Sequence, residues 1–195
     1  MTKVLISALA LAFGVLCGPA FAQGGAPEPQ KEMTPAQHRA EVAKNAQAAI
    51  ARFKKEDPGL DRFFKESAGY AVFPRVGKAG FIFSAGHGDG ELFEKGKVVG
   101  FASITLASVG LTAGAQDYAE IVFFQNQESL GAFKQGKFEF GANASAVIVK
   151  SGVSKDKTWQ NGAAVFAMPN GGAMAEASVG TQKFSFKPNE PAKKK

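Results

Sequence analysis

The residues best suited to chemistry in this 195-residue sequence are basic side chains near its amino-terminal end. Residues 31–78 hold ten Lys and Arg residues against six Asp and Glu residues, a net charge of +4. Each Lys or Arg near an anionic bilayer adds about 1 kcal/mol of attraction, although a solvated helix face has the same composition. The candidate headgroup-binding residues are Arg52, Lys54, Lys55, Arg62, Lys65, Arg75 and Lys78.

The rest of the chain is less basic. Residues 79–186 carry eight bases and nine acids, whereas the tail 187–195 carries four Lys and one Glu. The whole chain has a formal charge of +6, which would by itself suit nucleic-acid binding. The nearly neutral body and the export predicted below argue against a nucleic-acid partner, and the tail is interpreted as solubilising.

The sequence lacks the residue patterns of common metal and nucleophile enzymes. One Cys excludes a thiolate metal site, and two His residues, His38 and His87, exclude the commonest zinc sites. Gly86-x-Gly88-x-Gly90 is not followed by the Gly-Lys-Ser/Thr triplet of a P-loop, so this pattern predicts a hairpin turn. No nucleophile stands out as a partner for His87. We therefore expect no enzyme activity, no cofactor and no metal.

Residues 1–22 have the pattern of a secretory signal peptide. Lys3 gives a positive start, Val4 to Leu16 are almost all apolar, and Ala20-Phe21-Ala22 is a small-x-small cleavage site. The apolar run is shorter than the ~20 residues of a spanning helix. The protein is thus expected to be exported, either periplasmic or secreted, with peripheral membrane association allowed. The predicted organisation is a signal peptide at 1–22, a flexible leader at 23–33, one domain at 34–186 and a basic tail at 187–195.

Two helices are expected before any strand. Thr34-Pro35 is a helix start, Asp57-Pro58-Gly59 is a break, and a second short helix follows up to about Gly69. The first helix carries an apolar stripe at helical spacing: Val42, Ala46, Ala49, Ile50 and Phe53. The stripe is interpreted as packing on its own domain or as lying in a membrane interface. In the second interpretation Phe53, Phe63 or Phe64 would meet acyl chains.

From Gly69 onward the sequence predicts mainly strands. A short helix is expected at 126–135, around Leu130 and Phe133. Short strands are expected at Tyr70–Phe73, Gly80–Ala85, Glu91–Glu94, Lys97–Leu106, Tyr118–Phe124, 138–149, 162–168, 173–179 and 182–186. The predicted fold class is α+β: a β-rich antiparallel curved sheet or barrel-like body, preceded by amphipathic helices, with one short helix inserted between strands.

Five ordered blocks of this sequence resemble the SYLF-domain family. They span most of residues 34–186, and each consists mainly of Gly and apolar residues. The blocks are Ser67-Ala68-Gly69-Tyr70-Ala71-Val72-Phe73-Pro74-x-Val76-x-Lys78-Ala79-Gly80, Gly86-His87-Gly88-x-Gly90, Ser108-Val109-Gly110-x-x-x-Gly114-x-Gln116, Phe140-Gly141-Ala142-x-Ala144-Ser145 and Gly171-Gly172-x-Met174-x-Glu176-Ala177-Ser178-x-Gly180. The chain is similar to the secreted bacterial branch in particular.

The resemblance implies a non-enzymatic module that binds phospholipids, phosphatidylinositol lipids among them in eukaryotic members, through basic residues and a leading amphipathic helix. Lys78 is the cation that the matched blocks carry over. Two positions depart from the family pattern. The Trp-Ser-x-Pro stretch of many eukaryotic members is missing, with Lys97-Val98-Val99-Gly100 near its place, and Thr112 stands where many members have Gln. Actin binding is not carried over, because an exported bacterial-type protein meets no actin in its own cell.

The sequence therefore predicts a phospholipid-binding protein of the cell envelope whose partner is an anionic phospholipid or membrane surface. The alternatives are a small outer-membrane β-barrel and an envelope structural protein. Surface binding through exposed charges would weaken with salt, whereas an acyl chain held in a cavity would be much less sensitive. The sequence does not separate these two modes, and it leaves the oligomeric state open.

Overall fold

The structure is a computed structural model, and it describes residues 33–112, 115–140, 147–148, 154, 159–171 and 176–189. The chain divides into two units, Met1–Glu32 and Met33–Lys195, and every described residue belongs to the second unit. The predicted signal peptide, all but the last residue of the predicted leader, and residues 190–195 of the predicted tail lie outside the described residues.

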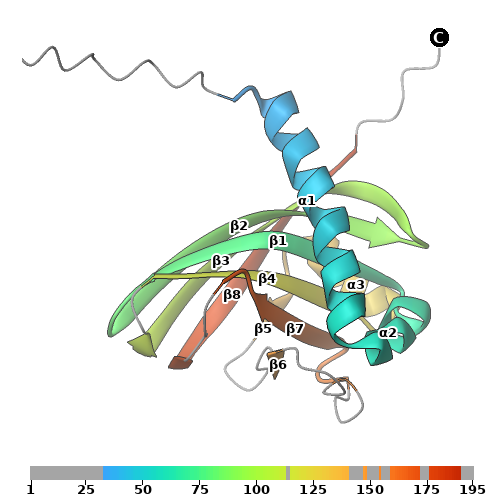
Figure 1. Cartoon of the computed structure of the whole chain (residues 1–195). Coiled ribbons are helices and arrows are strands. Elements are labelled where there is room, and N and C mark those ends of the chain that lie inside the picture. Colours follow the sequence, from blue (N-terminus) through green and yellow to red (C-terminus); the bar gives the residue numbers. More distant parts are fainter. Residues whose placement is uncertain are drawn as a thin grey trace, which may run out of the picture. The chain divides into compact units, whose positions relative to one another are not determined.

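Three α-helices and a one-turn 3-10 helix accompany a sheet (Figure 1). The helices are α1 (Pro35–Glu56), η1 (Pro58–Leu60), α2 (Asp61–Glu66) and α3 (Gln127–Lys134). The strands are β1 (Gly69–Gly80), β2 (Phe83–Glu94), β3 (Lys97–Thr112), β4 (Ala115–Phe124), β5 (Glu139–Phe140), β6 (Val147–Ile148), β7 (Ala163–Pro169) and β8 (Glu176–Pro188).

The predicted helix start is confirmed at α1. The Thr34 side chain accepts a hydrogen bond from the Gln37 backbone N–H, and the Gln37 side chain accepts one from the Thr34 backbone N–H. This capping box satisfies two amide groups that the helix itself leaves unpaired, and Pro35 has the backbone angle of a first turn. No helix within the described residues is long and apolar enough to cross a bilayer.

The strands form a single sheet in the order β5-β8-β3-β2-β1-β4-β7-β6. All neighbouring pairs are antiparallel except β6 and β7. The sheet curves without closing, α1 and α2 precede it, and α3 lies between β4 and β5 (Figure 1). The predicted α+β class, with a curved antiparallel sheet and one inserted helix, is confirmed.

The two faces of the sheet have separate apolar cores. On the outer face, Ala46, Ala49 and Phe53 of α1 pack with α2 and with alternate residues of β1, β4 and β7, including Tyr70 and Phe123. On the inner face, Leu130 and Phe133 of α3 pack against Phe184 and its neighbours. The sheet is therefore sandwiched over part of its length, and the residues of one strand alternate between the two cores.

The inner face is strongly concave. Gln182 on β8 donates a hydrogen bond to Glu120 on β4, at 3.3 Å, although β3, β2 and β1 lie between these strands. Four strand spacings along a flat sheet would cover about 19 Å. The side chains meet because the sheet curls around them.

The prediction of a hairpin turn at Gly86-x-Gly88-x-Gly90 is wrong, since these glycines lie in the middle of β2. All three point to the concave face, where an added Cβ would come within 2.7 Å of Gly77 O, 2.6 Å of Arg75 O and 2.2 Å of Val72 O, respectively. Missing side chains permit this close approach and the curvature. The chain turns instead at Phe81-Ile82, between β1 and β2.

Several predicted short strands are parts of longer ones. The segments Tyr70–Phe73 and Lys97–Leu106 lie within β1 and β3, which have 12 and 16 residues. The segments 173–179 and 182–186 fall largely in one strand, β8, and within 138–149 the described strands are the two short ones, β5 and β6. Small residues in the sequence suggest that a strand ends, but here the strands continue through them, and their backbone hydrogen bonds extend across the curved part of the sheet.

Candidate functional site

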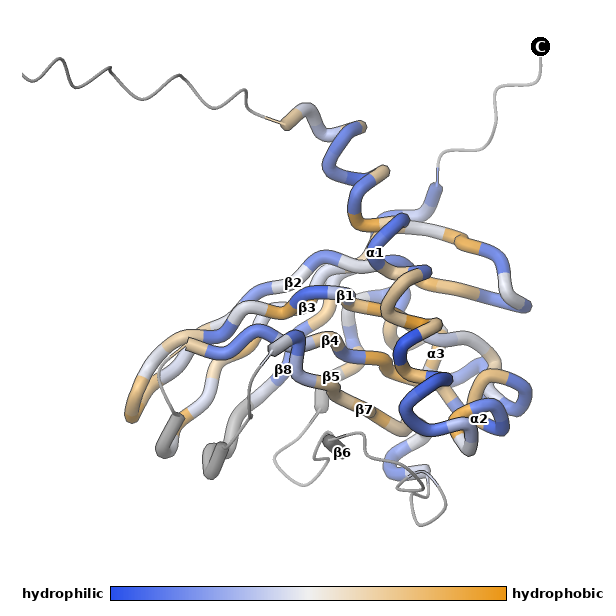
Figure 2. The backbone as a smooth tube through the Cα atoms, in the orientation of Figure 1, coloured by the Kyte–Doolittle hydropathy of each residue, from blue (hydrophilic) through white to orange (hydrophobic). Residues whose placement is uncertain are grey.

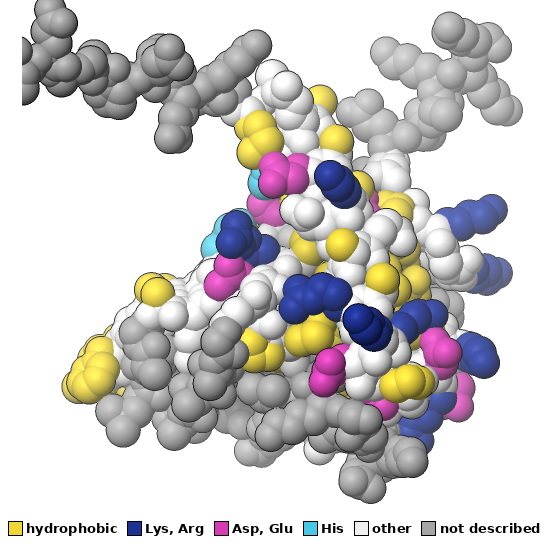
Figure 3. Space-filling model, in the orientation of Figure 1, with side chains coloured by type: hydrophobic (Ala, Val, Ile, Leu, Met, Phe, Trp, Pro, Cys, Tyr) yellow, Lys and Arg dark blue, Asp and Glu magenta, His cyan; other side chains and the backbone are white. Residues whose placement is uncertain are grey.

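The predicted headgroup-binding residues lie mainly on and beside α1 and α2. Figure 3 shows several Lys and Arg side chains over α1 and to the right of it. Their exposure and their contacts divide all of them except Lys78 into two groups. One group is engaged in bonds that hold the fold together, and the other projects into solvent.

Arg52 and Arg75 belong to one polar network at the outer face. Arg52 donates to the Asn170 side-chain oxygen at 2.8 Å and to Pro169 O at 3.1 Å. Asn170 donates to Asp117 at 2.7 Å, and Asp117 accepts from Arg75 Nε at 2.7 Å. The network ties the carboxyl-terminal part of α1 to the end of β7 and to β1 and β4, so both guanidinium groups have a structural role.

Arg62 and Lys54 are also held by neighbours. Arg62 donates to Ser154 O at 2.5 Å and lies 4.6 Å from the centre of the Phe63 ring. Lys54 pairs with Asp61 at 3.0 Å and lies 4.5 Å from the centre of the Phe64 ring. These cation–π, ionic and hydrogen-bonding contacts join α1 to α2 and α2 to Ser154.

Lys78 lies apart from the helix cations. Its side chain is 7% exposed and sits on β1 two residues after Val76, which contributes to the inner core. Alternation along the strand places both on the concave face. Lys78 therefore shares no surface with the residues of α1 and α2, which pack on the outer face.

Lys55 and Lys65 are exposed, and neither forms an ion pair with any other residue that the structure describes. Lys44, which was counted in the basic segment but not proposed as a site residue, is also exposed. Lys44 and Lys55 are eleven residues apart, about three helical turns, and lie opposite the buried stripe. The spacing of Lys44 from Val42 and Ala46 was the sequence signal that could have identified it.

The large apolar residues of this segment are not available to acyl chains in this structure. Phe53 and Phe63 are fully buried, and Phe64 is half-buried against Tyr70 and Phe123. Trp159 also packs edge-on against Phe63, with ring centres 5.1 Å apart. Of the two interpretations of the apolar stripe, packing on the domain is the one the structure realises.

The concave face becomes polar toward the end of the sheet that carries the β1–β2 turn. Ser84 and Ser108 bond to each other at 2.7 Å, and Gln182 bonds to Glu120. Burial raises the pKa of Glu120 to about 8, and the hydrogen bond from Gln182 opposes this shift. The Glu120 carboxyl is therefore protonated at neutral pH. Its second oxygen, Oε1, has no hydrogen-bond partner within the part of the chain described.

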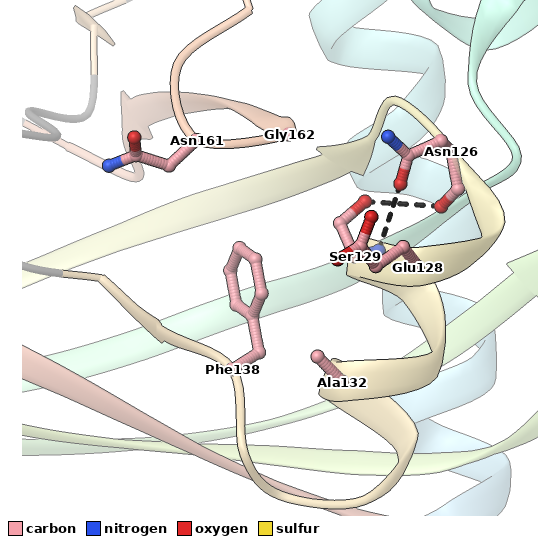
Figure 4. Close-up of a pocket in the computed structure, with 7 residues that line it drawn as sticks. All are labelled: Asn126, Glu128, Ser129, Ala132, Phe138, Asn161 and Gly162. Carbon is pink, nitrogen blue, oxygen red and sulfur yellow. Dashed lines mark hydrogen bonds between the residues drawn. The ribbon is translucent and has the colours of Figure 1, made fainter.

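A pocket of about 310 Å³ lies beside the start of α3 (Figure 4). Asn126 caps this helix by accepting from the Ser129 N–H at 2.9 Å, and the Ser129 hydroxyl donates to Asn126 O at 3.1 Å. Phe138 forms part of the opposite wall. Asn126 and Ser129 thus serve the helix cap. Within the described residues, no group of three or more His, Cys, Asp or Glu side chains could hold a metal ion.

Sequence comparison finds a family model that matches the carboxyl-terminal part of the chain. The family model described as "Ysc84: Las17-binding protein actin regulator" matches residues 105–193. This is the SYLF-domain family, so the match agrees with the resemblance noted in the sequence. No curated protein matches the chain.

The family is one of lipid-binding and actin-regulating modules and is not a known enzyme family. The match therefore agrees with a lipid-binding role in general terms. The matched range begins within β3 and does not include α1, α2 or the seven predicted site residues.

Proposed function

We propose that this chain is a non-enzymatic phospholipid-binding protein of the cell envelope that engages anionic headgroups through lysines on α1 and α2. Its predicted signal peptide supports an envelope location. The observation that carries the headgroup contact is the set of exposed lysines without ion-pair partners among the described residues, namely Lys44, Lys55 and Lys65. The arginines nearby are occupied in holding α1 and α2 to the sheet.

The solvent-facing side of α1, opposite its buried stripe, suits contact with a flat surface. Lys44 and Lys55 are separated along this face by Ala48 and Ala51, which lie at helical spacing between them. Small side chains there leave the two ammonium groups standing out from the helix. Lys65 extends the set onto α2. Long flexible lysines can reach phosphate groups without moving the helix, since their charged ends stay in water.

Vesicle co-sedimentation tests this proposal. We expect the purified protein to bind vesicles of phosphatidylcholine with phosphatidylglycerol more tightly than vesicles of phosphatidylcholine alone, and less tightly as salt rises. The triple variant Lys44→Gln/Lys55→Gln/Lys65→Gln should bind anionic vesicles about 100-fold more weakly, because each lysine contributes about 1 kcal/mol.

The matched control removes three exposed lysines elsewhere, Lys97→Gln/Lys137→Gln/Lys187→Gln. It changes the net charge by the same amount and should bind within about threefold of the parent protein. Equal losses in the two variants would mean that net charge alone matters and would contradict a localised site. Failure of the parent protein to bind either kind of vesicle would contradict lipid binding itself.

A further inference from the structure

The turn between β1 and β2 exposes a cluster of large apolar side chains. Phe81, Ile82 and Phe83 are 66%, 53% and 74% exposed, and Val109, which pairs with Phe83 across β2 and β3, is 56% exposed. Figure 2 shows hydrophobic colouring at this left-hand end of the sheet, and Figure 3 shows apolar side chains projecting from it. None of the four residues belongs to either core cluster. We refer to these four residues as the apolar tip.

The composition of this turn is unusual for a hairpin. Turns favour Gly, Pro, Asn, Asp and Ser, which suit the backbone and the solvent. Here Gly80, with φ of 152°, supplies the special backbone conformation, and three large apolar residues follow it. Gly110 N–H donates to Ile82 O at 2.8 Å, which fixes the turn against β3. The backbone of the turn is thus fixed by a hydrogen bond, while its apolar side chains project into solvent. These side chains do not pack against either core of the described fold.

Charged residues are missing from the sequence around the tip. Residues 79–86 and 98–116 contain no Asp, Glu, Lys, Arg or His. The first titratable residue after the turn on β2 is His87, four residues beyond Phe83 and about 13 Å away along the strand. Interfacial segments bury apolar side chains about 5–10 Å into the boundary between headgroups and acyl chains. The uncharged stretch of β2 is therefore long enough for the turn to reach that depth in the boundary without burying a charge.

We propose that the apolar tip inserts into the interfacial layer of a phospholipid bilayer. This inference rests on the proposed lipid-binding function and adds a second, hydrophobic contact to it. A second copy of the chain is a poorer occupant. The four side chains expose on the order of 450 Å², whereas a stable interface buries about 800 Å² on each partner.

The tip and the helix lysines can be tested separately. β1 runs from Gly69, next to α2, to Gly80, next to the turn, and its 12 residues span roughly 35 Å. Substitutions at the tip therefore leave Lys65 and its surroundings unchanged. Hydrophobic insertion also differs from headgroup attraction in being insensitive to screening.

The first experiment measures binding at high salt. The double variant Phe81→Ser/Phe83→Ser should bind phosphatidylcholine/phosphatidylglycerol vesicles at least tenfold more weakly than the parent protein when salt screens the lysines. The control Met33→Ser removes another exposed apolar side chain, away from the tip, and should change binding less than twofold. Unchanged high-salt binding of the double variant, or an absence of salt-resistant binding in the parent protein, would overturn the inference.

The second experiment places a probe at the tip. In Phe83→Trp, the introduced indole should shift its emission to the blue on vesicle binding and be quenched by lipids brominated on their acyl chains. Trp159, packed against Phe63, serves as the reference and should be quenched much less. A protein that sediments with vesicles without quenching of the new indole binds through headgroup contacts alone, so the inference fails while the proposed function stands.

Two further outcomes are informative. If neither the parent protein nor Phe83→Trp binds any vesicle at low salt, the proposed function fails together with the inference. If the parent protein is a dimer by sedimentation without lipid and Phe81→Ser/Phe83→Ser is a monomer, the tip is covered by a second copy and insertion is overturned.

Discussion

The same residue type has opposite environments at the two ends of one sheet. At the end covered by α1 and α2, Phe53, Phe63 and Phe123 are fully buried. At the other end, Phe81 and Phe83 are among the most exposed apolar residues that the structure describes. The concave face changes in parallel, from Phe73 and Val122 near the helices to Gln182 and the Ser84–Ser108 pair near the tip.

This difference indicates that the helix-covered end stabilises the fold, whereas the tip end offers an exposed apolar surface for an interaction. A Phe that packs among other rings contributes several kcal/mol to folding, and its removal leaves a cavity. A Phe in water contributes almost nothing to folding, and exposed apolar clusters mark sites of interaction. The tip residues should therefore be dispensable for the fold, and the covered residues should not.

The largest expected effect is on folding at the covered end. Phe63 lies against Phe166, Trp159 and Phe123, with ring centres 5.0, 5.1 and 5.6 Å away. Phe63→Ala should lower the free energy of unfolding by about 3–5 kcal/mol, whereas Phe83→Ala should change it by less than about 0.5 kcal/mol. Urea denaturation of both variants measures the contrast. Similar losses in the two would break the comparison.

An effect that depends on pH is expected from Glu120, on the concave face. Its pKa is about 8 in the folded protein and near 4.5 in the unfolded chain, so between these values the folded state holds one proton more than the unfolded state. The free energy of unfolding then falls as pH rises through this window, by at most about 1.4 kcal/mol per pH unit. Below pH 4.5 the carboxyl is protonated in both the folded and the unfolded state, so Glu120 no longer makes the free energy of unfolding depend on pH.

The variant Glu120→Gln isolates this contribution. Gln keeps the shape of the protonated carboxyl and does not titrate, so the variant should gain stability relative to the parent protein as pH rises from 5 to 8. Denaturation of both proteins across this range measures the difference. A difference that stays constant with pH would show that Glu120 titrates alike in the folded and unfolded states.

The smallest effect is expected at the exposed pair between Arg75 and Asp117, midway between the two ends. Arg75 is 77% exposed on its side chain, and exposed ion pairs contribute about 0.2–1 kcal/mol. Arg75→Ala should therefore shift the thermal midpoint slightly, and high salt should reduce even this shift. A loss as large as that of Phe63→Ala would show that the Arg75–Asp117–Asn170 network controls the docking of α1.

Helices and the α+β class could be predicted because their signals are local. Thr34-Pro35 gives the cap and first turn of α1, and the spacing of Val42, Ala46 and Phe53 gives its buried side. The strand interiors were harder, because glycines in β2 have the local pattern of a turn. These positions require glycine because the backbone oxygens of Val72 and Arg75 on the neighbouring strand lie too close for a Cβ atom. That contact joins segments that are distant in sequence.

The candidate site followed the same division. The sequence by itself determined which segment is basic, which residues cap and which face of α1 is apolar, since composition, capping and periodicity act within a few residues. Only the tertiary structure decided that Arg52 and Arg75 join one network through Asn170 and that Lys78 lies inside the curve. It also decided that Phe81-Ile82-Phe83 form an exposed tip. The burial and the pairing of a side chain depend on residues that the fold brings together from distant parts of the sequence, so a local sequence pattern does not predict them.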